Sequence, residues 1–221
     1  MLINCDIGER GVAHETDDRL MAMIDIANIA CGGHSGNKES VDYYTDLAKQ
    51  HRVKITAHLS YPDKTNFGRK VLNISAQKLL RSLDEQYALM SDVKTVKFHG
   101  ALYNEANVNE ELAKLLLKWL ETNEVEEILT PSNSFLNSLK SSVHVIHEAF
   151  LDRTYIIKDG VLQLSPRALP DAVITDPSDA LKQFYEIQDG RLLDKALKAQ
   201  TLCLHSDNAN ALEILKAIKS V

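Results

Sequence analysis

Histidine and acidic side chains recur at one kind of position in this sequence, at or just after the end of a short apolar run. The residues that share this position are Asp6, Glu9, His34, His58, His99, Glu148 and His205. Histidine exchanges protons near neutral pH and a carboxylate can act as a general base, so the set is suited to acid–base chemistry on a bound substrate. Each residue taken alone also has a structural explanation, as a hydrogen-bonded side chain. The prediction of one common site therefore rests on the repeated occurrence of these residues at the same kind of position.

The same residue types are ligands for zinc or a similar ion, which makes metal binding the main rival interpretation. The chain contains neither a His-x-x-x-His nor a His-Glu-x-x-His motif. We therefore assign no metal ligand from the sequence. The glycine-rich segment 31–36 suits close backbone approach to an anion, or simply a tight connection. Cys31 is a poor candidate nucleophile, because nothing in the sequence indicates a lowered thiol pKa.

The charge composition of the chain limits the kinds of molecule that it is expected to bind. The formal net charge is −6, with 25 Lys and Arg against 31 Asp and Glu, so neither nucleic acid nor an anionic membrane surface is an expected partner. No apolar run approaches the roughly 20 residues of a membrane span, and Met1 is not followed by a signal-peptide pattern, which predicts a cytoplasmic protein. A Gly-x-x-x-x-Gly-Lys-Ser/Thr phosphate cradle is absent. The three cysteines fit no disulfide or metal spacing and are expected to be free.

Short apolar runs alternate with stretches of helical period along the whole chain, which predicts an α/β fold with parallel strands. No Gly-x-Gly-x-x-Gly fingerprint follows the first run, and the polar residues fall near the ends of most runs rather than at one crossover. We therefore predict a single domain, residues 1–221, that forms a closed (β/α) TIM-like barrel with about seven parallel strands. The predicted strands are 2–5, 24–30, 53–57, 96–98, 127–129, 143–146 and 201–204.

The predicted helices separate these strands, with capping residues expected at Thr16, Ser75 and Asn109. Their ranges are 17–23, 38–51, 76–90, 110–120, 133–139, 178–188 and 209–219. One segment, 149–175, breaks the rhythm and is predicted to be a long loop holding a hairpin around Lys158-Asp159-Gly160. His147 and Glu148 alternate along their strand, so only one can face the barrel interior, and we choose Glu148. His14, His51 and His144 are interpreted as structural or solvated.

Several motifs together resemble the LamB/YcsF family, the A subunits of 5-oxoprolinase, and they occur in order over essentially the entire chain. They are Asn4-Cys5-Asp6-Ile7-Gly8-Glu9, Ala27-Asn28-Ile29-Ala30-Cys31-Gly32-Gly33-His34-Ser35-Gly36, Ala57-His58-Leu59-Ser60-Tyr61-Pro62-Asp63, Phe67-Gly68-Arg69, Lys97-Phe98-His99-Gly100-Ala101-Leu102-Tyr103-Asn104, Glu148-Ala149-Phe150-Leu151-Asp152-Arg153 and Cys203-Leu204-His205-Ser206-Asp207-Asn208. The resemblance implies a distorted seven-stranded barrel similar to polysaccharide deacetylases. It also implies ATP-dependent hydrolysis of 5-oxoproline in company with B and C subunits.

On this interpretation the complex uses ATP, and this chain hydrates and opens a lactam ring that its partners have activated. Asp6 or Glu148 is expected to act as the general base, while His58 and His99 donate or shuttle protons. The expected substrate-binding residues are Asn4, His34, Arg69, Lys97, Arg153, Arg167 and His205. Two alternatives stay open: a metal-dependent deacetylase or amidohydrolase acting alone, and a noncatalytic substrate-binding subunit. The sequence is also compatible with a homo-oligomer.

Overall fold

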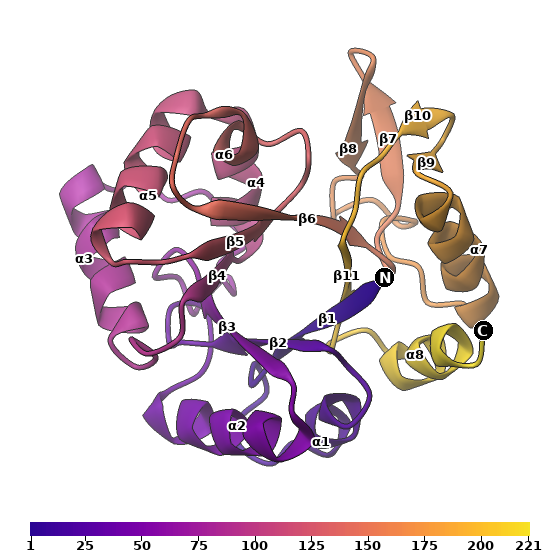
Figure 1. The fold of residues 1–221 in the computed structure, drawn as a ribbon, viewed down its shortest axis with the longest axis horizontal. Helices are drawn as coiled ribbons and strands as arrows, with labels where there is room; N and C mark the ends of the chain where they lie inside the picture. Colours follow the sequence, from indigo (N-terminus) through magenta and orange to yellow (C-terminus); the bar gives the residue numbers. More distant parts are fainter.

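Seven parallel strands close into a barrel, as predicted. The structure is a computed structural model that describes all residues from 1 to 221 (Figure 1). The barrel strands are β1 (Leu2–Ile7), β2 (Ile26–Ala30), β3 (Lys54–Leu59), β4 (Thr95–Phe98), β5 (Glu127–Thr130), β6 (His144–Phe150) and β11 (Thr201–His205). Their order around the barrel is β1-β11-β6-β5-β4-β3-β2, and β1 pairs in parallel with both β2 and β11. The sheet therefore has no free edge strand.

Helices surround the barrel on its outer side (Figure 1). They are α1 (Glu15–Met21), α2 (Lys38–His51), α3 (Ala76–Tyr87), α4 (Gly100–Val108), α5 (Glu110–Thr122), α6 (Phe135–Ser138), α7 (Pro177–Gln188) and α8 (Ala211–Lys219). Ser75 and Asn109 cap α3 and α5 with their side chains, as predicted. The expected cap at Thr16 is wrong: α1 begins at Glu15, two residues before the predicted start, and His14 occupies the cap position without a side-chain bond.

Helix α4 is the one helix that the sequence did not predict. It begins at Gly100, directly after His99, which makes no side-chain capping bond. Gly100 has a φ of +58°, and a Cβ there would lie 2.6 Å from the backbone oxygen of Gly68. A helix that starts with glycine and lacks a side-chain cap carries no recognisable start signal. Close approach of these two backbones requires the glycine and brings α4 to the end of β4.

Two hairpins extend the barrel on the side of β6 and β11. β7 (Tyr155–Lys158) and β8 (Val161–Leu164) pair antiparallel, which confirms the predicted hairpin. A second hairpin, β9 (Arg191–Leu192) with β10 (Lys195–Ala196), was not predicted. Its two turn residues, Leu193 and Asp194, have φ values of +49° and +60°. Such a turn normally carries Asn-Gly or Asp-Gly, so the sequence gives no signal for it.

Alternation along the strands separates an apolar outer layer from a polar interior. Ile3, Cys5 and Ile7 of β1 belong to the main core of 49 buried residues, between strands and helices, whereas Asn4 and Asp6 point the other way and are buried inside the barrel. A second, small apolar cluster consists of Ile26, Leu129 and Ile146. Ile26 and Ile146 share a strand face with Asn28 and Glu148, two residues further on. An apolar layer thus lies beneath a polar one inside the barrel.

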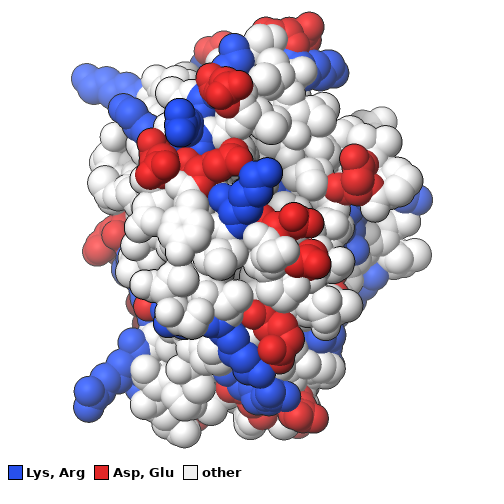
Figure 2. All heavy atoms as spheres, turned by 90° about the vertical axis from the view of Figure 1, so that its right-hand side faces the viewer, with Lys and Arg blue, Asp and Glu red and all other residues white.

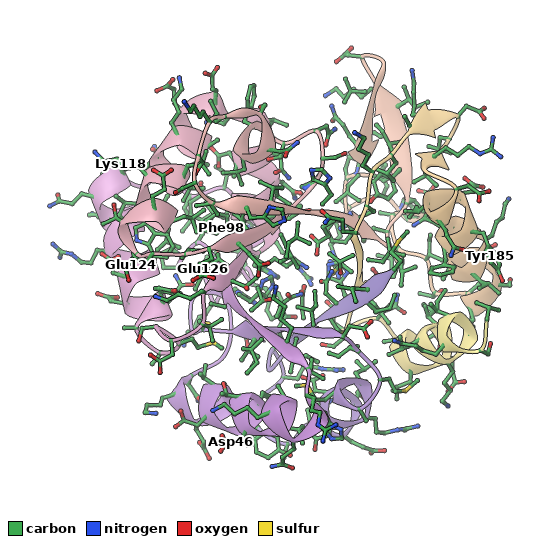
Figure 3. The ribbon with its side chains drawn as sticks, viewed as in Figure 1. Asp46, Phe98, Lys118, Glu124, Glu126 and Tyr185 are labelled. Carbon is green, nitrogen blue, oxygen red and sulfur yellow. The ribbon has the colours of Figure 1, made fainter.

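Charged side chains lie mainly on the outer surface. In Figure 3, Asp46, Lys118 and Tyr185 project outward from the helical layer, whereas Phe98 lies on the barrel wall. On the face seen in Figure 2, Lys and Arg are interspersed with Asp and Glu, so that face shows no patch of a single sign. None of the helices combines the length and the apolar character needed to cross a membrane.

Candidate active site

A cavity of about 860 Å³ opens at the carboxyl ends of the barrel strands. Nine of the eleven predicted site residues line it: Asp6, His58, Arg69, Lys97, His99, Glu148, Arg153, Arg167 and His205. Asn4 and His34 do not line the cavity and lie buried behind it. Asp6, His58, Glu148 and His205 are the last residues of their strands or lie within two residues of the strand end, so they project from regular backbone. Convergence of residues from separate strands at this end is what a parallel barrel provides.

The deepest part of the cavity holds a lysine between two carboxylates, which we call the floor: Asp6, Lys97 and Glu148. Lys97 Nζ lies 3.0 Å from Asp6 Oδ1 and 3.0 Å from Glu148 Oε1. It also donates to Asn4 Oδ1 at 3.2 Å, and Asn28 Nδ2 donates to Asp6 Oδ1 at 2.9 Å. Burial disfavours the charge on Lys97, but the surrounding acidic groups, Asp6 foremost, outweigh it and hold the lysine pKa well above its usual value.

Glu148 differs from Asp6 in its hydrogen bonding. The side chain is fully buried, and neither carboxylate oxygen has a hydrogen-bond partner; the contact with Lys97 is an ion pair outside hydrogen-bond geometry. The hydroxyl of Tyr103, which lines the same cavity, is also buried and neighbours Glu148, but outside strict hydrogen-bond geometry. Burial and the neighbouring Glu148 raise the pKa of Tyr103 well above its usual value. Buried carboxylate oxygens with spare acceptor capacity facing a cavity are suited to hold a water molecule or a substrate N–H.

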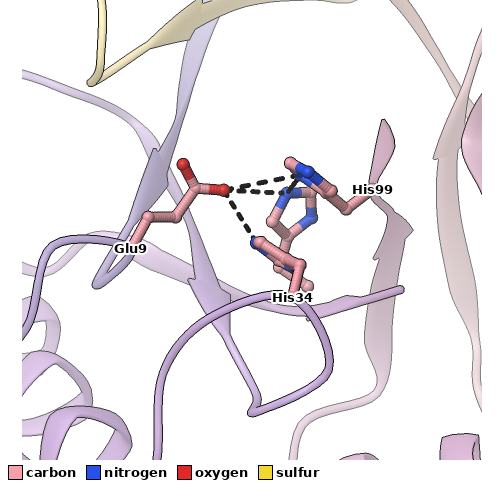
Figure 4. Close-up of side chains that lie close together, drawn as sticks. Glu9, His34 and His99 are labelled. Atoms are coloured by element: carbon pink, nitrogen blue, oxygen red, sulfur yellow. Dashed lines mark hydrogen bonds and ion pairs between the residues drawn. The ribbon is translucent and has the colours of Figure 1, made fainter. Parts of the chain in front are cut away.

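Three histidines and a glutamate form a second group beside the floor, which we call the histidine cluster: Glu9, His34, His58 and His99. Glu9 Oε1 lies 2.8 Å from His34 Nε2, 3.4 Å from His99 Nδ1 and 3.9 Å from His58 Nε2. Figure 4 shows one oxygen of Glu9 facing His34 and His99. The rings of His34 and His99 stack at 3.7 Å with an interplanar angle of 2°. Burial lowers the pKa of His34.

His205 is held by an acidic residue that the sequence analysis did not assign. Its Nδ1 lies 2.8 Å from Asp152 Oδ1, while its Nε2 lies 3.9 Å from Asp6 Oδ2. Asp152 also accepts from the His205 backbone N–H and from Asn208 Nδ2, both at 3.2 Å. Burial alone would lower the pKa of His205, but the Asp152 carboxylate outweighs burial and raises it. An imidazole oriented through Nδ1 by a carboxylate has the arrangement of a histidine that transfers protons through Nε2.

The arginines expected to bind substrate occupy different settings. Arg69 and Arg167 both pair with Asp207, at 2.6 Å and 3.0 Å, and we call these three residues the rim. Arg153 is buried and donates to the backbone carbonyls of Ala172 and Ser165. Its guanidinium therefore fixes the loop after β6 as well as lining the cavity.

Sequence reasoning missed several residues that complete the site. These are Asn28, Tyr103, Asp152 and Asp207. All four lie inside the family motifs. The motifs therefore indicated the right segments but not the role of each residue in them. Cys31 is buried, and burial raises its thiol pKa to about 12, which excludes it as a thiolate nucleophile near neutral pH.

Comparison with known proteins agrees with the resemblance in the motifs. The sequence pattern described as the LamB/YcsF family matches residues 1–221. A protein of Bacillus thuringiensis subsp. konkukian, named as the A subunit of 5-oxoprolinase, is 34% identical over 98% of this chain and 92% of that protein. A Haemophilus influenzae protein of the same name is 31% identical, over 98% and 93%.

A solved structure extends the comparison to the fold. The crystal structure of a lactam utilization protein from Thermus thermophilus superposes with a TM-score of 0.83 at 27% identity. The match covers 100% of this chain and 96% of that one. On the family match over its full length and on these relatives, the chain belongs to the LamB/YcsF family.

Proposed function

We propose that this chain is the A subunit of an ATP-dependent 5-oxoprolinase, which hydrolyses the lactam of 5-oxoproline to L-glutamate together with B and C subunits. The names of the relatives support the substrate class and the existence of partner subunits. The observation that carries a catalytic role is Glu148, a buried carboxylate in the cavity whose polar neighbours are Lys97, at 3.0 Å, and the Tyr103 hydroxyl. The reaction is proposed to take place in the cytoplasm.

An unstrained five-membered lactam is a weak electrophile, and ATP provides a way to activate it. In the proposed sequence the partner subunits transfer the γ-phosphoryl group of ATP to the amide oxygen. In this chain water then bonds to the activated carbon and gives its proton to Glu148. The ring C–N bond breaks, and a second water cleaves the resulting acyl phosphate into glutamate and inorganic phosphate. Lys97 would stabilise negative charge that develops on oxygen.

Delivery of a proton to the leaving nitrogen is better assigned to His205 than to His58 and His99, which were favoured from the sequence. His205 is oriented by Asp152 and presents Nε2 on the side of Asp6. In contrast, Nδ1 of His58 and Nε2 of His99 are each engaged by a backbone carbonyl oxygen, and their other nitrogens face one another. Asp6 then serves mainly to keep Lys97 charged and in place.

The arginines would recognise the two anionic parts of the activated substrate. Arg69 and Arg167 lie at the cavity, where their bond to Asp207 could be exchanged for one to a carboxylate or a phosphoryl group. Guanidinium groups suit both anions, because their donors form a planar fork.

Reconstitution tests the proposal. Conversion of 5-oxoproline to glutamate with ATP should be measured for this chain alone, for B and C homologues alone, and for the mixture. We expect turnover only in the mixture. Robust ATP-dependent turnover by the isolated chain would overturn the division of labour, and equal turnover by B and C with and without this chain would show that it is not the catalytic component.

A further inference from the structure

In the histidine cluster, several hydrogen-bond acceptor atoms face one another without an N–H proton between them. Nδ1 of His58 lies 3.2 Å from the backbone oxygen of Lys97, and Nε2 of His99 lies 3.0 Å from the backbone oxygen of Phe67. A carbonyl oxygen only accepts, so each of these ring nitrogens carries its N–H. In the neutral rings the opposite nitrogens, His58 Nε2 and His99 Nδ1, are therefore lone-pair acceptors. They face each other at 3.0 Å.

Two carboxylate oxygens, which are also acceptors, lie beside these nitrogens. Asp6 Oδ2 is 3.4 Å from His58 Nε2. Glu9 Oε1 lies 3.4 Å from His99 Nδ1 and 3.9 Å from His58 Nε2, and all three side chains are buried. Three lone-pair donors that converge without a proton between them repel one another unless a cation lies among them. Backbone carbonyls that fix the tautomer of each ring are the outer-shell arrangement seen around metal-bound histidines.

We propose that Glu9, His58 and His99 together bind one divalent transition-metal ion of the zinc class. Their donor atoms are separated by 3.0, 3.4 and 3.9 Å. Donors at tetrahedral zinc are about 3.3 Å apart, from bond lengths of about 2.0 to 2.1 Å. Two histidines and one carboxylate leave further coordination positions for water or substrate, and His58 and His99 both line the cavity.

His34 has a different part in this arrangement. Its ring lies parallel to that of His99 at 3.7 Å, so an ion in the plane of one ring is out of the plane of the other. Its Nε2 is 2.8 Å from Glu9 Oε1, while its Nδ1 has no partner (Figure 4). The proton therefore lies on Nε2, and His34 donates to Glu9. It is a positioning residue that orients the carboxylate.

Metal binding by the histidine cluster is separate from the proposed function and can be tested without turnover. The sequence contained suitable ligand types but could not single out these three residues, since they come from three different segments at long spacing. A bound ion would supply Lewis acidity next to the floor.

The test is equilibrium dialysis of the full chain against Zn²⁺, with metal and protein quantified on the same samples. We expect one equivalent per chain, and a rise in Kd of at least about 100-fold in Glu9→Gln and in His58→Gln, beyond the 10–100-fold typical of outer-shell changes. His34→Asn should weaken binding by about 10-fold. His51→Gln, which alters an exposed histidine on α2, is the matched control and should bind like the wild type.

Far-UV circular dichroism and the melting temperature of each variant separate loss of metal from loss of fold. If one ligand variant does not fold, the other still decides the result. The absence of stoichiometric Zn²⁺ on the folded wild-type chain would overturn the proposal. Equal binding by the wild type and a folded ligand variant would also overturn it, because the ion would then be held elsewhere. Neither result depends on 5-oxoproline turnover.

Discussion

The floor and the rim of the cavity use the same kind of interaction in opposite settings. Both are one-against-two charge arrangements: Lys97 between Asp6 and Glu148, and Asp207 between Arg69 and Arg167. Side chains of the floor are at most 3% exposed, whereas those of the rim are 28 to 36% exposed. The floor residues come from barrel strands and the rim residues from the loops after them. Removing one charge should therefore lower the free energy of unfolding strongly in the floor and only slightly at the rim.

The largest effect is expected for Lys97→Met. The substitution keeps the side-chain length but leaves two buried carboxylates without their cation, which should lower the free energy of unfolding by about 3 to 5 kcal/mol. Lys114→Met is the matched control and should leave the free energy of unfolding nearly unchanged, because Lys114 pairs with Glu110 and Glu111 on the exposed surface of α5. Denaturant titration of both variants measures the difference. A similar loss of unfolding free energy in the two variants would show that the floor is solvated.

Removing the charge of either floor carboxylate should slow catalysis as well as lower stability. Glu148→Gln preserves shape while removing the proton acceptor, and turnover of the reconstituted complex should fall by about 100-fold or more. Asp6→Asn should also slow turnover, because it weakens the hold on Lys97. Melting temperature and turnover must be measured on the same preparations. Variants that melt early yet remain nearly fully active when folded would assign both carboxylates a structural role.

The sequence predicted the floor better than the rim, for a physical reason. Strand ends are marked by short apolar runs, so the amino-acid pattern places Asp6 and Glu148 on one end of a parallel barrel, whereas Lys97 was assigned with the family resemblance. Loop conformation is not marked in this way. Asp207 was not assigned, although it determines where two arginines lie. Helix α4 was missed because its start, at Gly100, depends on a backbone contact with Gly68 that only the tertiary fold creates.

The ion pair between His205 and Asp152 should make stability depend on pH. Because Asp152 raises the pKa of His205 in the folded chain, the stabilisation is fully present below the unfolded value of about 6.5 and is lost as pH rises through the raised folded pKa. The difference in unfolding free energy between wild type and Asp152→Asn should therefore be larger at about pH 5.5 than at about pH 8.5. The bonds to the His205 N–H and Asn208 persist at both values, so some difference should remain. A difference in unfolding free energy that does not change with pH would contradict the ion pair between His205 and Asp152.

The smallest effect is expected at the rim. Asp207→Asn should change the free energy of unfolding by less than about 1 kcal/mol, because both of its ion pairs are partly exposed. It should alter the KM for 5-oxoproline more than kcat, since it frees two arginines for the substrate. A stability loss as large as that of Lys97→Met would erase the distinction between floor and rim.

The most direct test of the central claim is the coupling ratio of a reconstituted complex that carries Glu148→Gln. Phosphate release from ATP and glutamate formation should be followed in the same reaction, with the wild-type complex beside it. If the partners activate the lactam and this chain hydrolyses it, the variant should lose glutamate formation by about 100-fold while ATP hydrolysis continues, so that the two become uncoupled. Glutamate formation at the wild-type rate and ratio by the folded variant would contradict a catalytic role for the floor.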